Sequence, residues 1–329
     1  PIVLIIAQRE TGSALVFVSL IFVLYREGLS GLFLFYGLCA IVYFVVAVKY
    51  SGEMWGAVAV GEVLVFILIL LVVAGMLLFY QKNEKAARYL MLGYLAVSAV
   101  CGALFYFDVP VNLLYVCVGA TVATVIYLLV LYFSSRSLRI LTILATAVVS
   151  VAFLFSVDYA FNDVLEPHQQ KRIKVALGME EDLRGAGYNV NQSKIAIGSG
   201  GFWGKGFLNG TQTKLRYVPE QDTDFIFCTI GEEEGFWGAA GVILLFVTLI
   251  FRLMVIGERQ HSAFGRVYAY CVVSILFFHL AVNVGMVIGL CPVIGIPLPF
   301  FSYGGSSLWG FTILLFVLLR IDASRAERH

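Results

Sequence analysis

Residues 57–80, AVAVGEVLVFILILLVVAGMLLFY, carry a single charged side chain, that of Glu62. A helix needs about 20 apolar residues to cross the ~30 Å hydrocarbon core of a bilayer. The strands of a membrane barrel alternate apolar and polar residues, and this run does not. The stretch therefore predicts a transmembrane helix.

Eight further runs of the same kind lie on either side, at residues 11–26, 29–50, 86–107, 112–133, 138–160, 234–256, 266–290 and 304–321. The composition also favours a membrane protein, since 60% of the residues are hydrophobic and 13% are charged. A soluble domain has roughly 25% charged residues. We expect an all-α polytopic membrane protein with about nine transmembrane helices and one long polar loop between the sixth and the seventh.

Basic residues fall in alternate connections between these runs, and this pattern orients the predicted bundle. The basic set comprises Arg26; Lys82, Lys85 and Arg88; Arg136 and Arg139; Arg259 and Arg266; and, in the tail, Arg325 and Arg328. The short connections at 51–56 and 108–111 contain neither Lys nor Arg. The positive-inside rule predicts that the basic set and the C-terminus are cytoplasmic and that the loop is extracytoplasmic.

Three predicted parts follow: a bundle of six spans at 1–160, an extracytoplasmic loop at 161–233, and three last spans at 234–329 with an outer re-entrant turn at 291–306. Pro1–Ala7 resembles the end of an apolar segment, so we expect the chain to be truncated at its N-terminus. The net charge of +1 gives no reason to expect a nucleic-acid partner.

The end of the loop, Pro219-Glu220-Gln221-Asp222-Thr223-Asp224-Phe225, places acids next to an apolar segment. Asp222 or Thr223 can cap a following helix, with Asp224 in its first turn. Asp224 has two interpretations. It can complement the helix dipole, or it can be a carboxylate in a partly dry site, poised as a general base.

Three consecutive acids, Glu232, Glu233 and Glu234, precede the seventh predicted span. They can be solvated and paired with cations, or Glu232 and Glu233 can join Asp222 in binding a divalent cation such as Mg²⁺ or Mn²⁺. Lys205, in a glycine-dense part of the loop, is either a solvated lysine or a cation for phosphate.

The segment from Gly295 to Ser307 contains Pro297 and Pro299 and breaks the helical pattern at membrane depth. Irregular backbone is tolerated there where it is buried in protein or lines a cavity. We therefore expect the turn to wall a site, where its serines and amides could hold phosphate or sugar oxygens; a purely structural hairpin is the alternative.

Other ionisable residues lie near the predicted spans. Arg9 and Glu10 can pair with each other or line the same cavity, and Glu62 and Asp158 lie inside or near the ends of spans. Intramembrane ionisable residues are functional candidates, but the sequence assigns these two no role. His279, in an apolar span, is expected to be a satisfied core histidine.

Two long motifs resemble those of the SEDS family, the shape, elongation, division and sporulation proteins. The first runs from Gly198 through Gly204-Lys205-Gly206, Gly210-Thr211-Gln212 and Thr223-Asp224-Phe225 to Gly235. The second runs from Asn283 to Ser306. The match covers roughly residues 165–310 and is closer to the elongation (RodA) than to the division (FtsW) members.

The resemblance implies a peptidoglycan glycosyltransferase that polymerises lipid II beside a class B penicillin-binding protein in the bacterial inner membrane. The family's essential aspartate falls on Asp224, which would act as the catalytic base. Residues expected to bind the lipid II or undecaprenyl-linked glycan are Lys205, Glu220, Thr223, Arg216, Gln212, Glu10, Ser302, Gly304, Gly305 and Ser306.

The sequence departs from the family pattern at several points. Asp222 stands where the family has His, and a second acid there could raise the pKa of Asp224 or bind a cation. Arg9 and Glu10 replace the Pro and Asp of a family motif. An acidic and a basic residue that precede this motif in the family are absent, and an extra helical pair is expected within 29–133.

Two other functions are compatible with an apolar chain of this kind. A transporter or flippase for a lipid-linked sugar would need a polar path across the bilayer, whereas the polar features here gather in the predicted outer half. A non-catalytic scaffold for the penicillin-binding protein would not need Asp224.

Overall fold

The computed structural model describes residues 2–8, 10–55, 58–107, 111–180 and 186–326, and these residues form two compact units. The first comprises residues 1–34 and 171–329, and the second comprises residues 35–170. The units do not follow the predicted three-part division, because the N-terminal helices pack on a C-terminal helix in the first unit.

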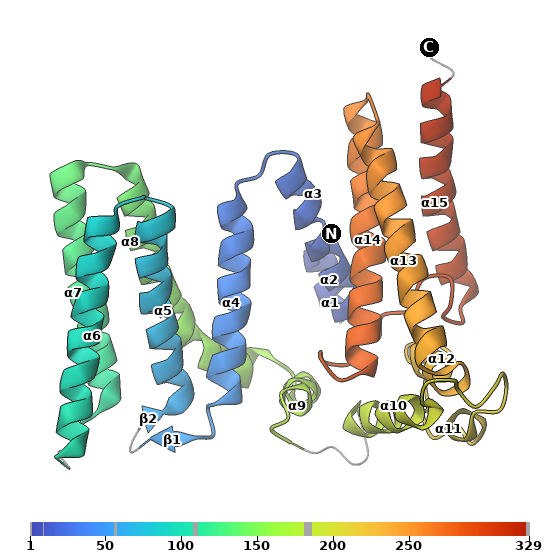
Figure 1. Ribbon diagram of the computed structural model, residues 1–329, viewed down its shortest axis with the longest axis horizontal. Helices are drawn as coiled ribbons and strands as arrows, with labels where there is room; N and C mark the ends of the chain where they lie inside the picture. The colour runs from blue at the N-terminus through green and yellow to red at the C-terminus, as the bar shows by residue number, and fades with distance from the viewer. Residues whose placement is uncertain (1, 9, 56–57, 108–110, 181–185, 327–329) are drawn as a thin grey trace. The chain divides into compact units, whose positions relative to one another are not determined.

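The second unit is a bundle of long apolar helices (Figure 1). Its elements are α4 (Gly31–Lys49), β1 (Met54–Trp55), β2 (Val58–Ala59), α5 (Val60–Phe79), α6 (Glu84–Tyr106), α7 (Leu113–Ser135), α8 (Leu138–Tyr159) and the π-helical turn η1 (Ala160–Val164). Helix α5 lies at its centre and packs on α6, α7 and α8. The two short strands form an antiparallel hairpin before α5.

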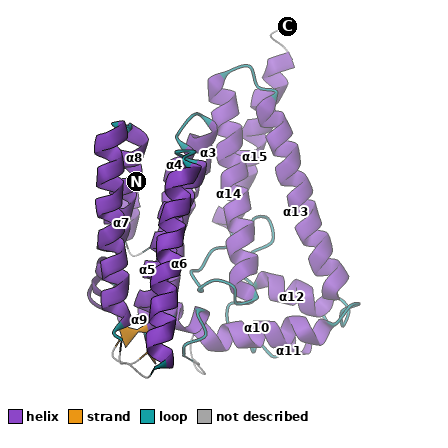
Figure 2. Ribbon diagram, turned by 60° about the vertical axis from the view of Figure 1, so that its left-hand side comes forward, coloured by secondary structure: helices purple, strands orange, loops and turns teal. Residues whose placement is uncertain are grey.

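The first unit combines three long helices with a group of shorter ones. Its elements are α1 (Ile2–Ala7), α2 (Thr11–Ser19), α3 (Ile21–Arg26), α10 (Ala186–Gly200), α11 (Thr211–Lys214), α12 (Ile226–Glu233), α13 (Gly235–Glu258), α14 (Ala263–Val287) and α15 (Gly305–Ala326), and the unit boundary falls within α9 (Pro167–Ala176). Figures 1 and 2 show α10 and α12 running across one end of α13 and α14. The predicted polar loop is therefore a packed layer of helices.

Eight helices in the described part of the chain are long and apolar enough to cross a membrane: α4, α5, α6, α7, α8, α13, α14 and α15. They agree with eight of the nine predicted spans. The ninth, predicted at 11–26, is a shorter apolar helix over Gly12–Arg26, which a break at Leu20 divides into α2 and α3. Here α2 ends at Ser19 and α3 begins at Ile21, and the Ser274 hydroxyl donates to the Ser19 carbonyl at 2.8 Å. A side chain that captures a helix carbonyl interrupts the helix.

Two ion pairs lie near the C-terminal end of α13. Arg26 of α3 binds Glu258 at 2.9 Å, and Arg266 of α14 binds Glu27 at 2.8 Å. The turn that contains Asp224 precedes α12, at the other end of α13. The basic residues and the acidic turn of this unit are thus separated by the length of a membrane-spanning helix.

Candidate active site

Asp224 lies in an irregular turn rather than in the helix that follows it. Helix α12 begins at Ile226 with Phe225 at its N-cap position, and no side chain caps it. The predicted cap by Asp222 or Thr223 is wrong, because the Thr223 hydroxyl donates instead to Glu220, at 3.1 Å from its carboxylate. Asp224 is therefore held by tertiary contacts and not by a helix terminus.

Four hydrogen bonds connect this turn, α14 and the segment between α14 and α15. The buried Asn283 amide of α14 donates to the carbonyls of Asp224, at 2.8 Å, and Ile296, at 2.7 Å. The Ser302 hydroxyl donates to the Thr223 carbonyl at 2.6 Å. The Tyr303 amide donates to the Asp222 carbonyl at 2.8 Å. The backbone on both sides of Asp224 is consequently fixed.

The segment from Gly289 to Gly304 has neither helix nor strand, and it walls the position of the Asp224 carboxylate as predicted. A Cβ built on Gly295, whose φ is +69°, would lie 3.3 Å from Asp224 Oδ2. On the other side of this segment, Gly12 of α2 packs so closely that a Cβ there would lie 2.9 Å from the Ile294 carbonyl. Gly295 thus allows the segment to approach the Asp224 carboxylate, and Gly12 allows α2 to approach the segment.

Two further side chains hold the wall. His279 of α14 bonds through Nδ1 to the Pro297 carbonyl at 3.0 Å, which confirms the core histidine. Arg172 of α9 donates to the Val293 carbonyl at 3.1 Å. Sequence reasoning gave no role to Arg172 or Asn283. An amide side chain within an apolar segment was a signal that could have pointed to Asn283, whereas Arg172 had none.

The Asp224 carboxylate is partly exposed, and no group in the described part of the chain donates a hydrogen bond to it. Burial raises its pKa above the ordinary value, and the nearby Glu220 charge raises it further, while Arg172 opposes them. The acid that acts on this pKa is thus Glu220 and not Asp222, contrary to the expectation from the sequence. Asp224 can accept a proton in a half-dry site.

A second cluster lies at the opposite end of α12, around the fully buried Glu232. Its carboxylate accepts from Lys205 at 2.7 Å and from the backbone amides of Gln212 and Thr213 at 2.9 Å. Burial by itself would raise the pKa of Glu232, but Lys205 and these amides lower it to about 2. Glu232 therefore has a cation partner but is not solvated.

Close backbone contacts support the Glu232 cluster. Gly204, at φ +74°, comes so near to the end of α12 that a Cβ there would lie 2.0 Å from the Glu233 carbonyl. The amides of Lys205 and Gly206 donate to the carbonyls of Glu232 and Glu233. Only glycine fits such an approach at a positive φ.

The structure separates the residues expected in the site into two groups. Glu220, Thr223, Ser302 and Asp222 lie with Asp224, whereas Lys205, Gln212, Glu232 and Glu233 lie at the far end of α12. The helix has eight residues, about 12 Å at 1.5 Å per residue. Arg216 is exposed in the turn after α11, and Gly304, Gly305 and the exposed Ser306 lead into α15.

The predicted metal ligands do not fit a resident cation. Among the described residues, no three His, Cys, Asp or Glu side chains come together as a metal-binding group. Both oxygens of Glu232 are already engaged by Lys205 and backbone amides. The predictions that involve Arg9 and the Asp158 side chain lie outside the described residues.

The fold and this site define the chain as a polytopic α-helical membrane protein with a carboxylate-bearing turn at one end of its helices. A model of the FtsW/RodA/SpoVE family of cell cycle proteins matches residues 113–327. The chain belongs to this family.

Several named relatives are similar to parts of the chain. The peptidoglycan glycosyltransferase MrdB of Escherichia coli K12 is 45% identical over 181 residues, which cover 55% of this chain and 48% of MrdB. The peptidoglycan glycosyltransferase RodA of Treponema pallidum is 44% identical over 162 residues, 49% of this chain and 37% of RodA. The chain thus spans about half or less of the length of these relatives.

A division-type relative and a solved structure complete the comparison. The probable peptidoglycan glycosyltransferase FtsW of Trichlorobacter lovleyi is 38% identical over 205 residues, 62% of this chain and 52% of that protein. The structure described as "Structural coordination of polymerization and crosslinking by a peptidoglycan synthase complex" aligns with a TM-score of 0.43 at 22% identity, over 97% of this chain and 89% of that one.

Proposed function

We propose that this chain is part of a peptidoglycan glycosyltransferase that polymerises lipid II, with Asp224 as the general base. The observation that carries the proposal is the Asp224 carboxylate: it is partly exposed, its pKa is raised by burial, and its backbone is fixed by Asn283. The relatives MrdB and RodA, which are named peptidoglycan glycosyltransferases, support the same activity.

In the proposed reaction, a sugar hydroxyl of the acceptor lipid II gives its proton to Asp224. The hydroxyl oxygen forms a bond with the anomeric carbon of the growing glycan, while the bond from that carbon to undecaprenyl diphosphate breaks. The diphosphate leaves with the bonding electron pair. A single displacement with inversion needs one general base and no covalent glycosyl-enzyme intermediate, which is the role we give to Asp224.

The negative charge on the leaving diphosphate requires cationic groups nearby. Arg172, whose charge acts on Asp224, is the cation of this chain that we place beside the reaction. Lys205 is engaged by Glu232 at the other end of α12, so we assign it to holding the helix. We assign no step to a metal ion.

We further propose that the Asp224 turn is extracytoplasmic and that the C-terminus is cytoplasmic, in the bacterial inner membrane. The basic residues at the end of α13 opposite this turn support that orientation through the positive-inside rule. A class B penicillin-binding protein is the proposed partner, since a glycan polymerase needs a cross-linking enzyme to produce a network.

The test is polymerisation of labelled lipid II by the purified full chain with its partner. Asp224→Asn should lower the rate by about 10²–10⁴-fold, the usual contribution of a general base. Asp222→Asn is the matched control, two residues away on the same turn, and it should retain activity. Full activity of Asp224→Asn refutes the proposal, and equal losses in both variants favour a cation site. Labelled lipid that crosses liposomes without glycan formation would indicate a transporter.

A further inference from the structure

A large groove lies within the second unit, between α5, α6 and α7. Its volume is about 1050 Å³, at the upper end of the usual range of roughly 300–1,000 Å³ for ligand pockets. Helices α5, α6 and α7 all line the groove, and α6 is the least buried of the three. In its most apolar stretch of 18 residues 6% are buried in the protein, compared with 50% in the corresponding stretch of α5.

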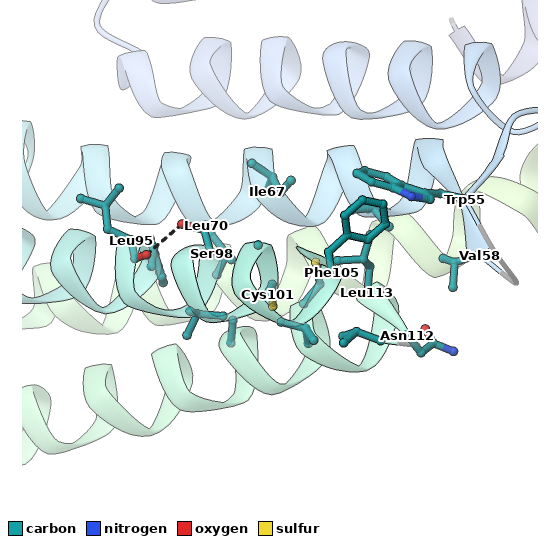
Figure 3. A pocket seen from close by; sticks show the side chains of 18 of the residues that line it. Trp55, Val58, Ile67, Leu70, Leu95, Ser98, Cys101, Phe105, Asn112 and Leu113 are labelled. Atoms are coloured by element: carbon teal, nitrogen blue, oxygen red, sulfur yellow. Dashed lines mark hydrogen bonds between the residues drawn. The ribbon is translucent and has the colours of Figure 1, made fainter. Parts of the chain in front are cut away.

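The groove begins where the three helices meet at one membrane surface. Trp55 and Phe105 pack edge to face there, with their ring centroids 6.3 Å apart, and Asn112 lies at the same end (Figure 3). Aromatic and amide side chains are typical of the level of lipid headgroups. This end is the rim of the groove.

From the rim the groove runs toward the middle of the bilayer. Along α6 it extends from Phe105 to Met91, about 21 Å, and along α5 it extends from Val63 to Leu71, about 12 Å, at 1.5 Å per residue. One leaflet accounts for about half of the ~30 Å hydrocarbon thickness. The groove therefore has about the depth of a single leaflet.

The interior of the groove offers an occupant almost nothing but hydrocarbon. The Tyr94 hydroxyl is bonded to Thr124 at 2.9 Å, and the Ser98 hydroxyl donates to the Leu95 carbonyl at 2.9 Å. An apolar cavity excludes water, and its lining loses dispersion contacts if it stays empty. An apolar chain from the surrounding bilayer would fill the groove without water and would restore the dispersion contacts of its lining.

Among the described residues, those that line the groove include no charged side chain. A prenyl diphosphate would need Lys or Arg beside its phosphates, whereas the ammonium of a zwitterionic phospholipid balances its own single phosphate charge. An acyl chain with an ester linkage at the rim needs only neutral donors such as the Asn112 amide and the Trp55 indole. We propose that the groove is a phospholipid site, in which one acyl chain lies along α6 and the headgroup lies at the Trp55–Asn112 rim.

The experiment uses the full chain, delipidated in detergent and titrated with palmitoyl-oleoyl phosphatidylethanolamine, with native mass spectrometry to count bound lipid. Gly102 lines the groove, and a Cβ there meets no atom within 4 Å. A phenylalanine at this position would occupy the path of the acyl chain. Gly102→Phe should weaken retention by about tenfold or more, because displacing two methylenes already has that effect.

Gly93→Phe is the matched control, because Gly93 is on the same helix, has the same open space and does not line the groove. A second pair of variants, on α7, distinguishes loss of the lipid site from misfolding of one variant: Ala120→Phe should release the lipid, and Gly119→Phe should not. Unchanged lipid binding in Gly102→Phe and Ala120→Phe overturns the proposal. Equal loss in the controls, or displacement of the phospholipid by undecaprenyl phosphate, also overturns it.

Discussion

Two carboxylates near the two ends of α12, Asp224 and Glu232, have pKa values shifted in opposite directions, although burial raises the pKa of both. Glu232 is fully buried, yet its pKa is lowered to about 2, because burial is outweighed by Lys205 and two backbone amides. Asp224 is only partly buried, yet its pKa is raised by that burial and by the Glu220 charge, because no hydrogen-bond donor among the described residues offsets them. The comparison shows that hydrogen-bond donors, rather than depth, separate a carboxylate that holds structure from one that can take a proton.

The largest expected effect comes from removing the charge of Glu232. Glu232→Gln removes the fully buried charge that Lys205 and two backbone amides share, and breaking a buried ion pair costs up to about 3–5 kcal/mol, less where the remaining partner, like the 26% exposed Lys205, reaches solvent. Chemical or thermal unfolding in detergent measures this change. Glu234→Gln is the control, since Glu234 is exposed two residues away and should change stability by less than about 0.5 kcal/mol.

The pH dependence of unfolding tests the same cluster. Because the pKa of Glu232 is lower in the folded state, its stabilisation is present above pH about 4.5 and is lost as the pH falls toward about 2. Glu232→Gln should remove this loss. An acid transition that is identical in wild type and variant would contradict the role of Glu232 as the charged centre of its cluster.

A smaller effect is expected at Asn283, on the Asp224 side of the comparison. Asn283→Leu removes the donor shared by the Asp224 and Ile296 carbonyls, and unsatisfied buried acceptors cost about 1–3 kcal/mol. Lipid II polymerisation should fall as well, because the turn is no longer fixed. Thr248→Val is the control: Thr248 is exposed and bonds only within its own helix. Undiminished polymerisation by a folded Asn283→Leu protein would show that the turn is held in other ways.

The smallest expected effects are shifts in the acid limb of the pH–rate profile, in opposite directions for Glu220→Gln and Arg172→Gln. A general base must be deprotonated, so activity falls as the pH drops through the pKa of Asp224. Glu220→Gln removes a charge that raises this pKa and should move the limb to lower pH. Arg172→Gln removes a charge that lowers it and should move the limb to higher pH. Shifts in the same direction would exclude Asp224 as the titrating group.

Much of the fold was predictable from local sequence. Eight of the nine predicted spans are long apolar helices in the described residues, because a chain segment in lipid must satisfy its own backbone hydrogen bonds. The predicted span at 11–26 is a shorter apolar helix divided at Leu20, and the carbonyl of the preceding Ser19 accepts a hydrogen bond from Ser274, 255 residues away in the chain. No local pattern encodes such a contact.

The sequence by itself indicated that lipid surrounds much of this protein. It also predicted nine spans, one more than the long apolar helices in the described residues. The family motif singled out Asp224 as the candidate base. Only the tertiary structure decided how the polar residues divide between two ends of α12. It placed Lys205 on Glu232 rather than beside Asp224, and it brought Arg172 and Asn283 to the turn that contains Asp224 and its neighbouring wall. Apolar periodicity is a local property, whereas the charge state of a carboxylate depends on donors that distant segments supply.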